Sequence, residues 1–220
     1  QDPSKQMTLF GEECALWAQD FFAALADEDG KTRVGLAFPD GKEARGTFGR
    51  LLCHVILADG RDFNLMLVRL GKSPYYNKYG NSRIAHEEFV AAQAHAREKQ
   101  LGIWNPRTNE PETPGAPVYK RNYDELLAWW QARADAIDAY ELRAAEDPIS
   151  IFSSEDDEML ETALLLGDEV TVFATIDRVF EERDGSRTFL MRASNKDKAL
   201  RVRVPAASVE ALAPADLDGL

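Results

Sequence analysis

One stretch, residues 46–71, constrains the fold of this chain most, and it reads GTFGRLLCHVILADGRDFNLMLVRLG. An apolar run over 51–57 ends at a tight turn at Asp59-Gly60, and leucines then recur at helical spacing up to Gly71. The pattern predicts a β-strand that leads directly into a short helix over 63–70. Arg50 lies just inside the strand, either as a solvated surface charge or as an arginine held rigidly to meet a phosphate.

Further elements are predicted on both sides of this stretch. Aromatic residues and leucines recur at helical spacing over 11–26, a short apolar run covers 32–38, and an alanine-rich pattern covers 84–100. These patterns predict a helix, a strand and a long helix, in that order. Residues 72–83, just before the long helix, are rich in tyrosine and asparagine and are expected to form a loop, called the tyrosine loop below.

A proline-rich segment separates the two halves of the chain. Residues 106–117 contain four prolines and a glycine, which is typical of a linker. We therefore expect a first domain at residues 1–105 and a second at residues 118–220. The second domain begins with helical patterns over 122–145 and 155–166, of which the latter is rich in acidic residues.

Three β-strands are predicted beyond these helices, over 170–180, 187–193 and 199–204. The Asp184-Gly185 pair is typical of a hairpin turn between the first two strands. A short helix over 205–212 follows the third strand. The second domain is therefore expected to be helical with a small antiparallel β-meander, and the chain as a whole to be α+β.

The net charge of −12 is distributed unevenly. Residues 1–105 hold 13 Lys/Arg and 14 Asp/Glu, whereas residues 106–220 hold 13 and 24. Within 42–83 eight basic residues accompany three acidic ones, whereas within 135–169 twelve acidic residues accompany Arg143 alone. Because electrostatic attraction depends on local charge, the basic stretch is able to meet phosphates even in an acidic protein.

The composition disfavours membrane proteins and disulfide scaffolds. No apolar run approaches the length of a membrane-spanning helix, so we expect no membrane partner. The first ten residues lack the apolar core of a signal peptide. Cys14 and Cys53 are the only cysteines, and both lie in apolar patterns. We expect them to be buried free thiols, with a single disulfide as the alternative.

Five stretches of the first half resemble the staphylococcal nuclease (thermonuclease) family in order and in spacing. They are LFGEECALWAQDFFAAL, RVGLAF, FGRLLCHVIL, DGRDFNLMLVRLG and NSRIAHEEFVAAQAHAREKQLGIW. Each stretch is a weak signal alone, but together they cover residues 9–104, a little under half of the chain. The resemblance implies an OB-fold, which in this family is a five-stranded barrel that carries three helices.

Active members of this family are calcium-dependent phosphodiesterases that cut DNA and RNA. The resemblance implies a site in which two arginines surround the scissile phosphate, aspartates hold the metal ion and a glutamate lies near the attacking water. Arg50 matches the second catalytic arginine, in the family's Tyr/Phe-Gly-Arg motif, which favours the phosphate-binding interpretation. Calcium is implied as a cofactor by the resemblance alone, because its ligands are not found in this chain.

Other residues of the family's binding surface have counterparts here, and the resemblance implies DNA or RNA as the partner. Arg45 is expected to help bind the nucleic acid. Thr47 stands where the family often has lysine, and Phe48 replaces a tyrosine. Tyr76 and Tyr79 fall near the family tyrosines that stack on a bound base. The alternative is that these two tyrosines pack against the long helix that follows them.

The sequence departs from the family at its start. In the family three strands precede the first helix, and they carry the first arginine, the metal-binding aspartates and an Asp-x-Pro-Glu motif. Here ten residues precede Gly11, and if Asp2 were the aspartate of that motif, Lys5 would replace its glutamate. We therefore expect an N-terminally truncated domain with an incomplete catalytic set and no metal ligands.

Two explanations account for the missing strands. Either the chain is a fragment of a longer protein, or strands from the C-terminal tail or from a second chain complete the barrel. If the tail completes it, Arg201 would lie near the place of the first arginine. The simpler interpretation of the meander is a separate small β-module that resembles the start of a second OB-fold.

The remaining clusters give weaker signals. His54, His86 and His95 lack metal-ligand spacing, and a histidine on a helix surface is the simpler interpretation. The acidic residues 156–158 are expected to begin a solvated helix rather than to bind calcium. Two hypotheses follow. One is a metal-dependent nuclease with Arg50 as its phosphate clamp, and the other is a non-catalytic module that binds nucleic acid or protein.

Overall fold

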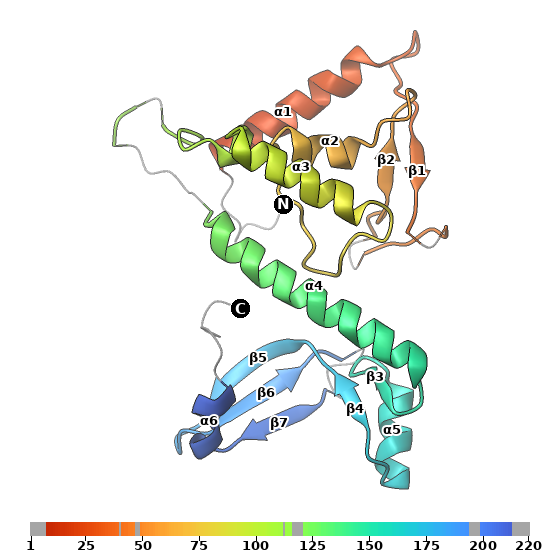
Figure 1. The fold of residues 1–220 in the computed structure, drawn as a ribbon, viewed down its shortest axis with the longest axis vertical. Coiled ribbons are helices and arrows are strands. Elements are labelled where there is room, and N and C mark those ends of the chain that lie inside the picture. Colours follow the sequence, from red (N-terminus) through yellow and green to blue (C-terminus); the bar gives the residue numbers. More distant parts are fainter. Residues whose placement is uncertain are drawn as a thin grey trace. The chain divides into compact units, whose positions relative to one another are not determined.

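The structure of the chain is a computed structural model that describes residues 8–39, 41–46, 49–111, 113–115, 121–193 and 199–212. The chain divides into two compact units, residues 1–137 and residues 138–220 (Figure 1). In the parts of the chain that the structure describes, no helix is long and apolar enough to cross a membrane.

The first unit is built mainly from helices. Its elements in chain order are α1 (Leu9–Ala24), β1 (Gly35–Ala37), β2 (His54–Ile56), α2 (Phe63–Arg69), α3 (His86–Glu98), the short 3₁₀ helix η1 (Gly102–Trp104) and α4 (Tyr123–Glu146). The four α-helices and the two strands lie where the sequence patterns predict them. The last helix, α4, begins in the first unit and ends in the second.

The sheet of the first unit has two strands. β1 pairs antiparallel with β2, with Leu36 opposite Val55, and a single bridge joins Arg45 to Leu51 before β2. Within the described residues, no further strand joins this sheet, so the mixed α+β class is confirmed but a closed five-stranded barrel is not. Because two strands alone are barely stable in water, the packing of the helices must support this sheet.

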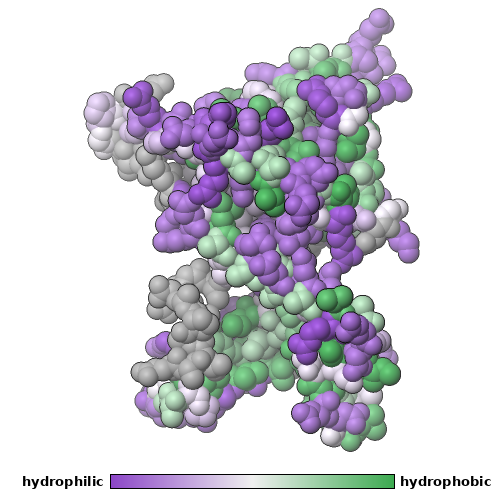
Figure 2. Space-filling model, viewed as in Figure 1, coloured by the Kyte–Doolittle hydropathy of each residue, from purple (hydrophilic) through white to green (hydrophobic). Residues whose placement is uncertain are grey.

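The core of the first unit lies between α2 and α3. Val68 of α2, Tyr75 of the tyrosine loop, and Phe89 and Ala92 of α3 form one buried cluster. Hydrophilic residues and smaller hydrophobic areas alternate on the face of this unit that Figure 2 shows. The cluster ties the tyrosine loop to two helices, and this attachment determines the geometry of the site described below.

Helix α1 contributes a second group of packed side chains. The rings of Trp17, Phe21 and Phe22 lie with their centroids 6.2, 5.5 and 4.6 Å from that of Phe63 at the start of α2. Aromatic pairs at such distances contribute beyond the area that they bury. The aromatic residues that predicted an amphipathic helix over 11–26 therefore attach α1 to α2.

Two glycines meet where α2 and α3 end. Gly71 and Gly102 both have positive φ angles, of 66° and 50°. A Cβ atom at Gly71 would overlap the carbonyl group of Leu101, and one at Gly102 would overlap the carbonyl group of Gly71. The N–H of Ile103 donates to the Gly71 carbonyl at 2.8 Å. The two chain segments thus touch backbone to backbone, which only glycine allows.

The cysteines of the first unit are free. Cys14 and Cys53 form no disulfide, so the predicted free thiols are confirmed, but both are half-buried rather than buried. The Cys14 thiol donates to the carbonyl of Lys72 at 3.6 Å, and burial raises the pKa of this thiol.

The second unit combines a parallel pair of strands with an antiparallel sheet. Its elements after α4 are β3 (Ile151–Ser153), α5 (Asp157–Leu166), β4 (Thr171–Phe173), β5 (Ile176–Glu181), β6 (Arg187–Met191), β7 (Arg201–Val204) and α6 (Ala206–Leu212). β3 pairs parallel with β4, whereas β5, β6 and β7 form an antiparallel sheet in that order. The predicted meander is confirmed, but the strand predicted over 170–180 is two strands that belong to different sheets.

The described residues give no support for completion of the barrel by the tail. Among them, β5, β6 and β7 pair only with one another, so the alternative that places Arg201 near the first arginine is unsupported. Nothing in the structure supports completion by a second chain. The two compact units divide within α4, after Ile137, and not at the proline-rich segment 106–117. The predicted domain boundaries, 1–105 and 118–220 with a linker at 106–117, stay a prediction.

Candidate functional site

Arg50 lies at the end of a short turn that leads into β2. In this turn, described at residues 43–46 and 49–52, the N–H of Gly46 donates to the carbonyl of Arg50 at 2.9 Å, and the N–H of Gly49 donates to the carbonyl of Gly46 at 2.8 Å. These bonds fix the backbone at Arg50 and at the residue before it, and Arg50 is exposed. Thr47 and Phe48, which were predicted to contact nucleic acid, lie outside the described residues.

Arg45 holds the same turn. Its Nε donates to the Glu43 carboxylate at 2.7 Å, and its Nη1 donates to the carbonyl of Gly49 at 2.8 Å. The side chains of Arg45 and Glu43 are each more than half exposed, so the ion pair itself contributes little. In the structure Arg45 therefore shapes the turn. The binding role expected of it from the sequence stays a prediction.

The tyrosine loop turns one of its tyrosines inward and two outward. Tyr75 is buried and stacks on Phe89 of α3, with centroids 4.8 Å apart and ring planes 5° apart. Tyr76 and Tyr79 are 51% and 65% exposed, and their rings meet edge to face at 5.9 Å. The residue that packs on the long helix is therefore Tyr75, and Tyr76 and Tyr79 keep faces on the surface.

A cavity of about 610 Å³ lies between the two segments. Its lining includes Leu51 and Leu52, directly after Arg50, together with His54, Tyr76, Tyr79 and Ser82. The structure thus brings the residues that directly follow Arg50 and the exposed tyrosines to one cavity, but Arg50 itself is not among the lining residues. Its walls combine apolar side chains with a few polar groups, as ligand-binding sites commonly do. Called the site cavity below, it is the candidate functional site of the first unit.

A hydrogen-bonded chain of side chains crosses the wall of the site cavity. His54 Nδ1 lies 2.5 Å from Asp62 Oδ2, and His54 Nε2 lies 3.4 Å from Ser82 Oγ. Asp62 also accepts from backbone N–H groups as the N-cap of α2. Ser82 Oγ in turn accepts from the N–H groups of Ile84 and Ala85 at 3.3 Å.

Aspartate, histidine and serine in this order are the groups that activate a serine nucleophile in hydrolases. Here the contact to Ser82 is long, and Ser82 Oγ is already held by two backbone N–H groups at the entry to α3. The hydrogen bonds among Asp62, His54 and Ser82 therefore tie the tyrosine loop to β2 and to the start of α2. His54 is a buried strand residue, so the helix-surface interpretation does not apply to it.

The second histidine of the region, at the start of α3, contacts the same loop. His86 Nδ1 lies 3.0 Å from the Tyr75 hydroxyl, which accepts from the N–H of Ser82 at 2.7 Å. His86 is half-buried at the start of α3, so the interpretation as a histidine at a helix surface is not contradicted here. The one signal for these contacts in the sequence is that His54 is the single polar residue within the apolar run 51–57.

The surroundings of Tyr76 raise the pKa of its phenol. Burial, followed by the hydrogen bond to Tyr79, raises the pKa of Tyr76 to about 12. A neutral phenol at neutral pH presents a ring face without a negative charge. Such a face is compatible with a nearby phosphate backbone.

The described residues do not supply a calcium site. Calcium prefers six to eight oxygen ligands. In the described part of the chain, however, no three His, Cys, Asp or Glu side chains gather in a way that would hold a metal ion. The described residues therefore do not fit the calcium ion that the family resemblance implies. No chemical step at this site is assigned to a metal ion.

Comparisons with known proteins agree with the resemblance. The family model described as "Staphylococcal nuclease homologue" matches residues 3–106. Endonuclease YhcR of Bacillus subtilis (strain 168) is 32% identical over 111 residues, which are 50% of this chain and 8% of that protein. The chain therefore spans only a small part of that curated relative. No solved structure matches the chain significantly. Residues 3–106, with the Arg50 turn and the tyrosine loop, are thus a domain of the staphylococcal nuclease family.

Proposed function

We propose that this domain belongs to a nuclease that hydrolyses phosphodiester bonds in DNA or RNA, and that Arg50 contacts the scissile phosphate. One observation carries the proposal. Leu51 and Leu52, which directly follow Arg50, line the same cavity as the exposed tyrosines Tyr76 and Tyr79. The relative named an endonuclease supports the same class of activity.

The chemistry of these groups suits a nucleic acid. The guanidinium of Arg50 is planar and permanently charged, so it is able to bind two phosphate oxygens and to stabilise the charge that develops on them. Tyr79 offers a ring on which any base is able to stack. The excess of basic residues over 42–83 attracts the phosphate backbone.

The proposal extends to two features that the described residues do not supply. These are the further strands of a five-stranded barrel and the ligands of a calcium ion. We expect activity to require calcium, as in the family. The residues that bind it would come from outside the described ranges.

Cleavage of a fluorescent single-stranded DNA tests the proposal. The chain is assayed with calcium and with a calcium chelator, and Arg50→Ala is compared with Arg69→Ala. Arg69 is an exposed arginine of the same basic stretch, at the end of α2. We expect Arg50→Ala to lower the rate by about 100-fold or more, as loss of a charge-stabilising donor does. Arg69→Ala should change the rate by less than about twofold.

The second candidate function is a non-catalytic module that binds nucleic acid. The observation in its favour is that the described residues include no cluster able to hold a metal ion. If the unmodified chain binds the DNA but does not cut it at any calcium concentration, this second function is correct and the nuclease proposal for this chain is wrong.

A further inference from the structure

Side chains of α4 hold the tyrosine loop through hydrogen bonds. Asn77 Nδ2 donates to Gln131 Oε1 at 3.0 Å, and Arg133 Nε donates to the carbonyl of Lys78 at 2.7 Å. These contacts join residues that are 54 and 55 positions apart in the sequence. The tyrosine loop and these residues of α4 all lie in the first compact unit.

Helix α4 presents a continuous stripe to the loop. Trp130 and Ala134 are buried, and Ile137 follows at the same helical spacing. The Trp130 ring meets that of Tyr76 edge to face at 4.6 Å. A Cβ atom at Gly80 would lie 3.5 Å from Ile137 Cγ2, so the loop backbone runs directly over the helix.

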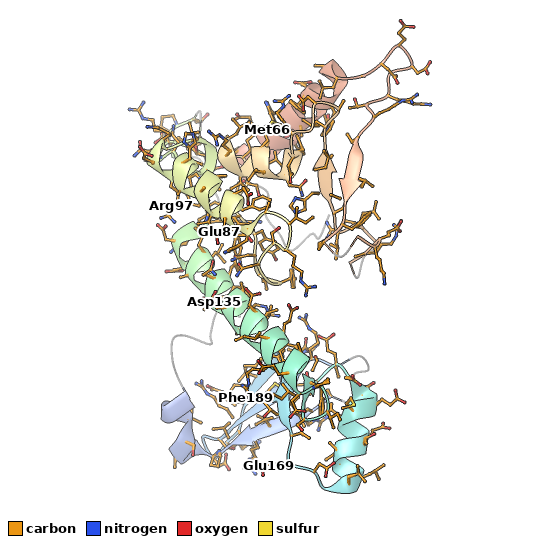
Figure 3. The ribbon with its side chains drawn as sticks, turned by 45° about the vertical axis from the view of Figure 1, so that its right-hand side comes forward. Met66, Glu87, Arg97, Asp135, Glu169 and Phe189 are labelled. Atoms are coloured by element: carbon orange, nitrogen blue, oxygen red, sulfur yellow. The ribbon has the colours of Figure 1, made fainter. Side chains whose placement is uncertain are left out.

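Basic side chains lie near aromatic rings where α4 meets the tyrosine loop. Lys78 Nζ lies 4.4 Å from the centroid of the half-buried Trp129 ring. Arg133 and Arg121 are the cations whose charge acts to lower the pKa of Tyr76 against the effect of burial. Figure 3 shows Asp135 midway along α4. Its carboxylate accepts from Gln131 Nε2 at 2.7 Å and thereby orients the amide that holds Asn77.

We propose that the first half of α4, residues 123–137, is part of the nucleic-acid site and positions Tyr76 and Tyr79 to receive an unpaired base. This inference rests on the proposed nucleic-acid binding. It adds a helix that lies outside residues 3–106, the range that the family model matches. In this arrangement Trp130 supports Tyr76, Tyr76 supports Tyr79, and the exposed face of Tyr79 takes the base.

The physical reason is preorganisation. An exposed loop must lose conformational freedom when it binds, and this cost subtracts from affinity. Contacts that fix the loop beforehand remove part of the cost. Arg133 and Gln131 act on the backbone and on Asn77 of the loop, so they are positioning residues and need not touch the ligand.

Binding by the full chain to two oligomers of about eight nucleotides tests the inference. One is oligothymidylate, and the other has the same backbone with abasic sites in place of the bases. Affinities are measured by fluorescence anisotropy in a calcium chelator, so that cleavage does not interfere. Base stacking should make the unmodified chain bind oligothymidylate about tenfold more tightly than the abasic oligomer.

Arg133→Met removes the bond to Lys78 and keeps the aliphatic stem. We expect it to reduce the preference for bases to about threefold or less. Gln131→Leu is the second variant, and because Gln131 is exposed, the fold should tolerate this substitution. Arg143→Met is the matched control. It is the same change on the same helix, at an exposed position ten residues further along, and should leave the preference unchanged.

The possible results separate the inference from the function on which it rests. If both positioning variants keep the tenfold preference, or weaken both oligomers by the same factor, α4 does not position the tyrosines and the inference is wrong. If the unmodified chain binds both oligomers equally, stacking on Tyr79 is wrong, while the Arg50 experiment still decides the nuclease proposal. If it binds neither oligomer, nucleic-acid binding and the inference fail together.

Discussion

The Arg50 turn and the tyrosine loop border the same cavity, but the structure holds them in different ways. The turn is closed by bonds between residues fewer than ten positions apart, including those of Arg45. The loop is held by side chains from β2, α3 and α4, up to 55 positions away. Local sequence shapes one side of the site, and tertiary packing shapes the other.

This difference has an energetic consequence. Exposed local bonds are worth little each, whereas buried long-range contacts combine burial with hydrogen bonding. We therefore expect substitutions that release the tyrosine loop to destabilise the first unit far more than substitutions in the turn.

The largest effect is expected for Trp130→Ala. Trp130 is 6% exposed and packs against Tyr76, so its truncation should cost about 3–5 kcal/mol of the free energy of unfolding. Urea titration of the full chain measures this cost. Trp129→Ala is the control at the adjacent, half-buried position and should cost about 1 kcal/mol. Equal costs for the two variants would contradict the support of the loop by α4.

A smaller effect is expected for Asp62. Asp62→Ala removes both the N-cap of α2 and the partner of His54, and should cost about 2 kcal/mol of the free energy of unfolding. Asp62→Asn keeps a capping oxygen and should cost about half as much. The same urea titration distinguishes the two. If Asn costs as much as Ala, the contact with His54 dominates and capping is minor.

The pH dependence of stability probes Tyr76. Its pKa is raised from 10.0 to about 12, so the folded state favours the neutral phenol. The full stability is present below pH 10, and the contribution of Tyr76 is lost as the pH rises from 10 toward 12. Tyr76→Phe should therefore leave stability at neutral pH nearly unchanged and make its decline at alkaline pH shallower. A decline of the same steepness in Tyr76→Phe would show that Tyr76 is not the tyrosine responsible.

The smallest effect is expected in the turn. Arg45→Met removes an exposed ion pair and one bond to a carbonyl, and should cost about 0.5 kcal/mol of the free energy of unfolding. Thermal unfolding followed by circular dichroism is the measurement. A loss as large as that of Trp130→Ala would reverse the comparison between turn and loop.

Much of the fold follows from local sequence patterns. Asp62 and Gly71 bound α2 because capping and chain reversal are properties of single residues and their neighbours. β3 was missed because it has three residues and exists only through its pairing with β4. For the same reason one strand was predicted over 170–180, where the structure has two strands with different partners.

The candidate site was predictable to a lesser degree. Arg50 and the two exposed tyrosines followed from the family resemblance, and the structure brings their segments to one cavity. The contacts of the loop with His54 and Arg133 were not predictable, because they join distant positions through single hydrogen bonds. No local period or spacing records such contacts.

The meeting of Gly71 and Gly102 has a consequence for genetics. Each position already carries the smallest residue. A Cβ atom added at either position would overlap mainly the backbone of the other segment. A neighbouring side chain can be trimmed by a second mutation, but a carbonyl group cannot. A selection for suppressors of Gly71→Ala should therefore return true revertants, and compensating changes at the facing segment should be absent. We therefore expect position 71 to accept glycine alone.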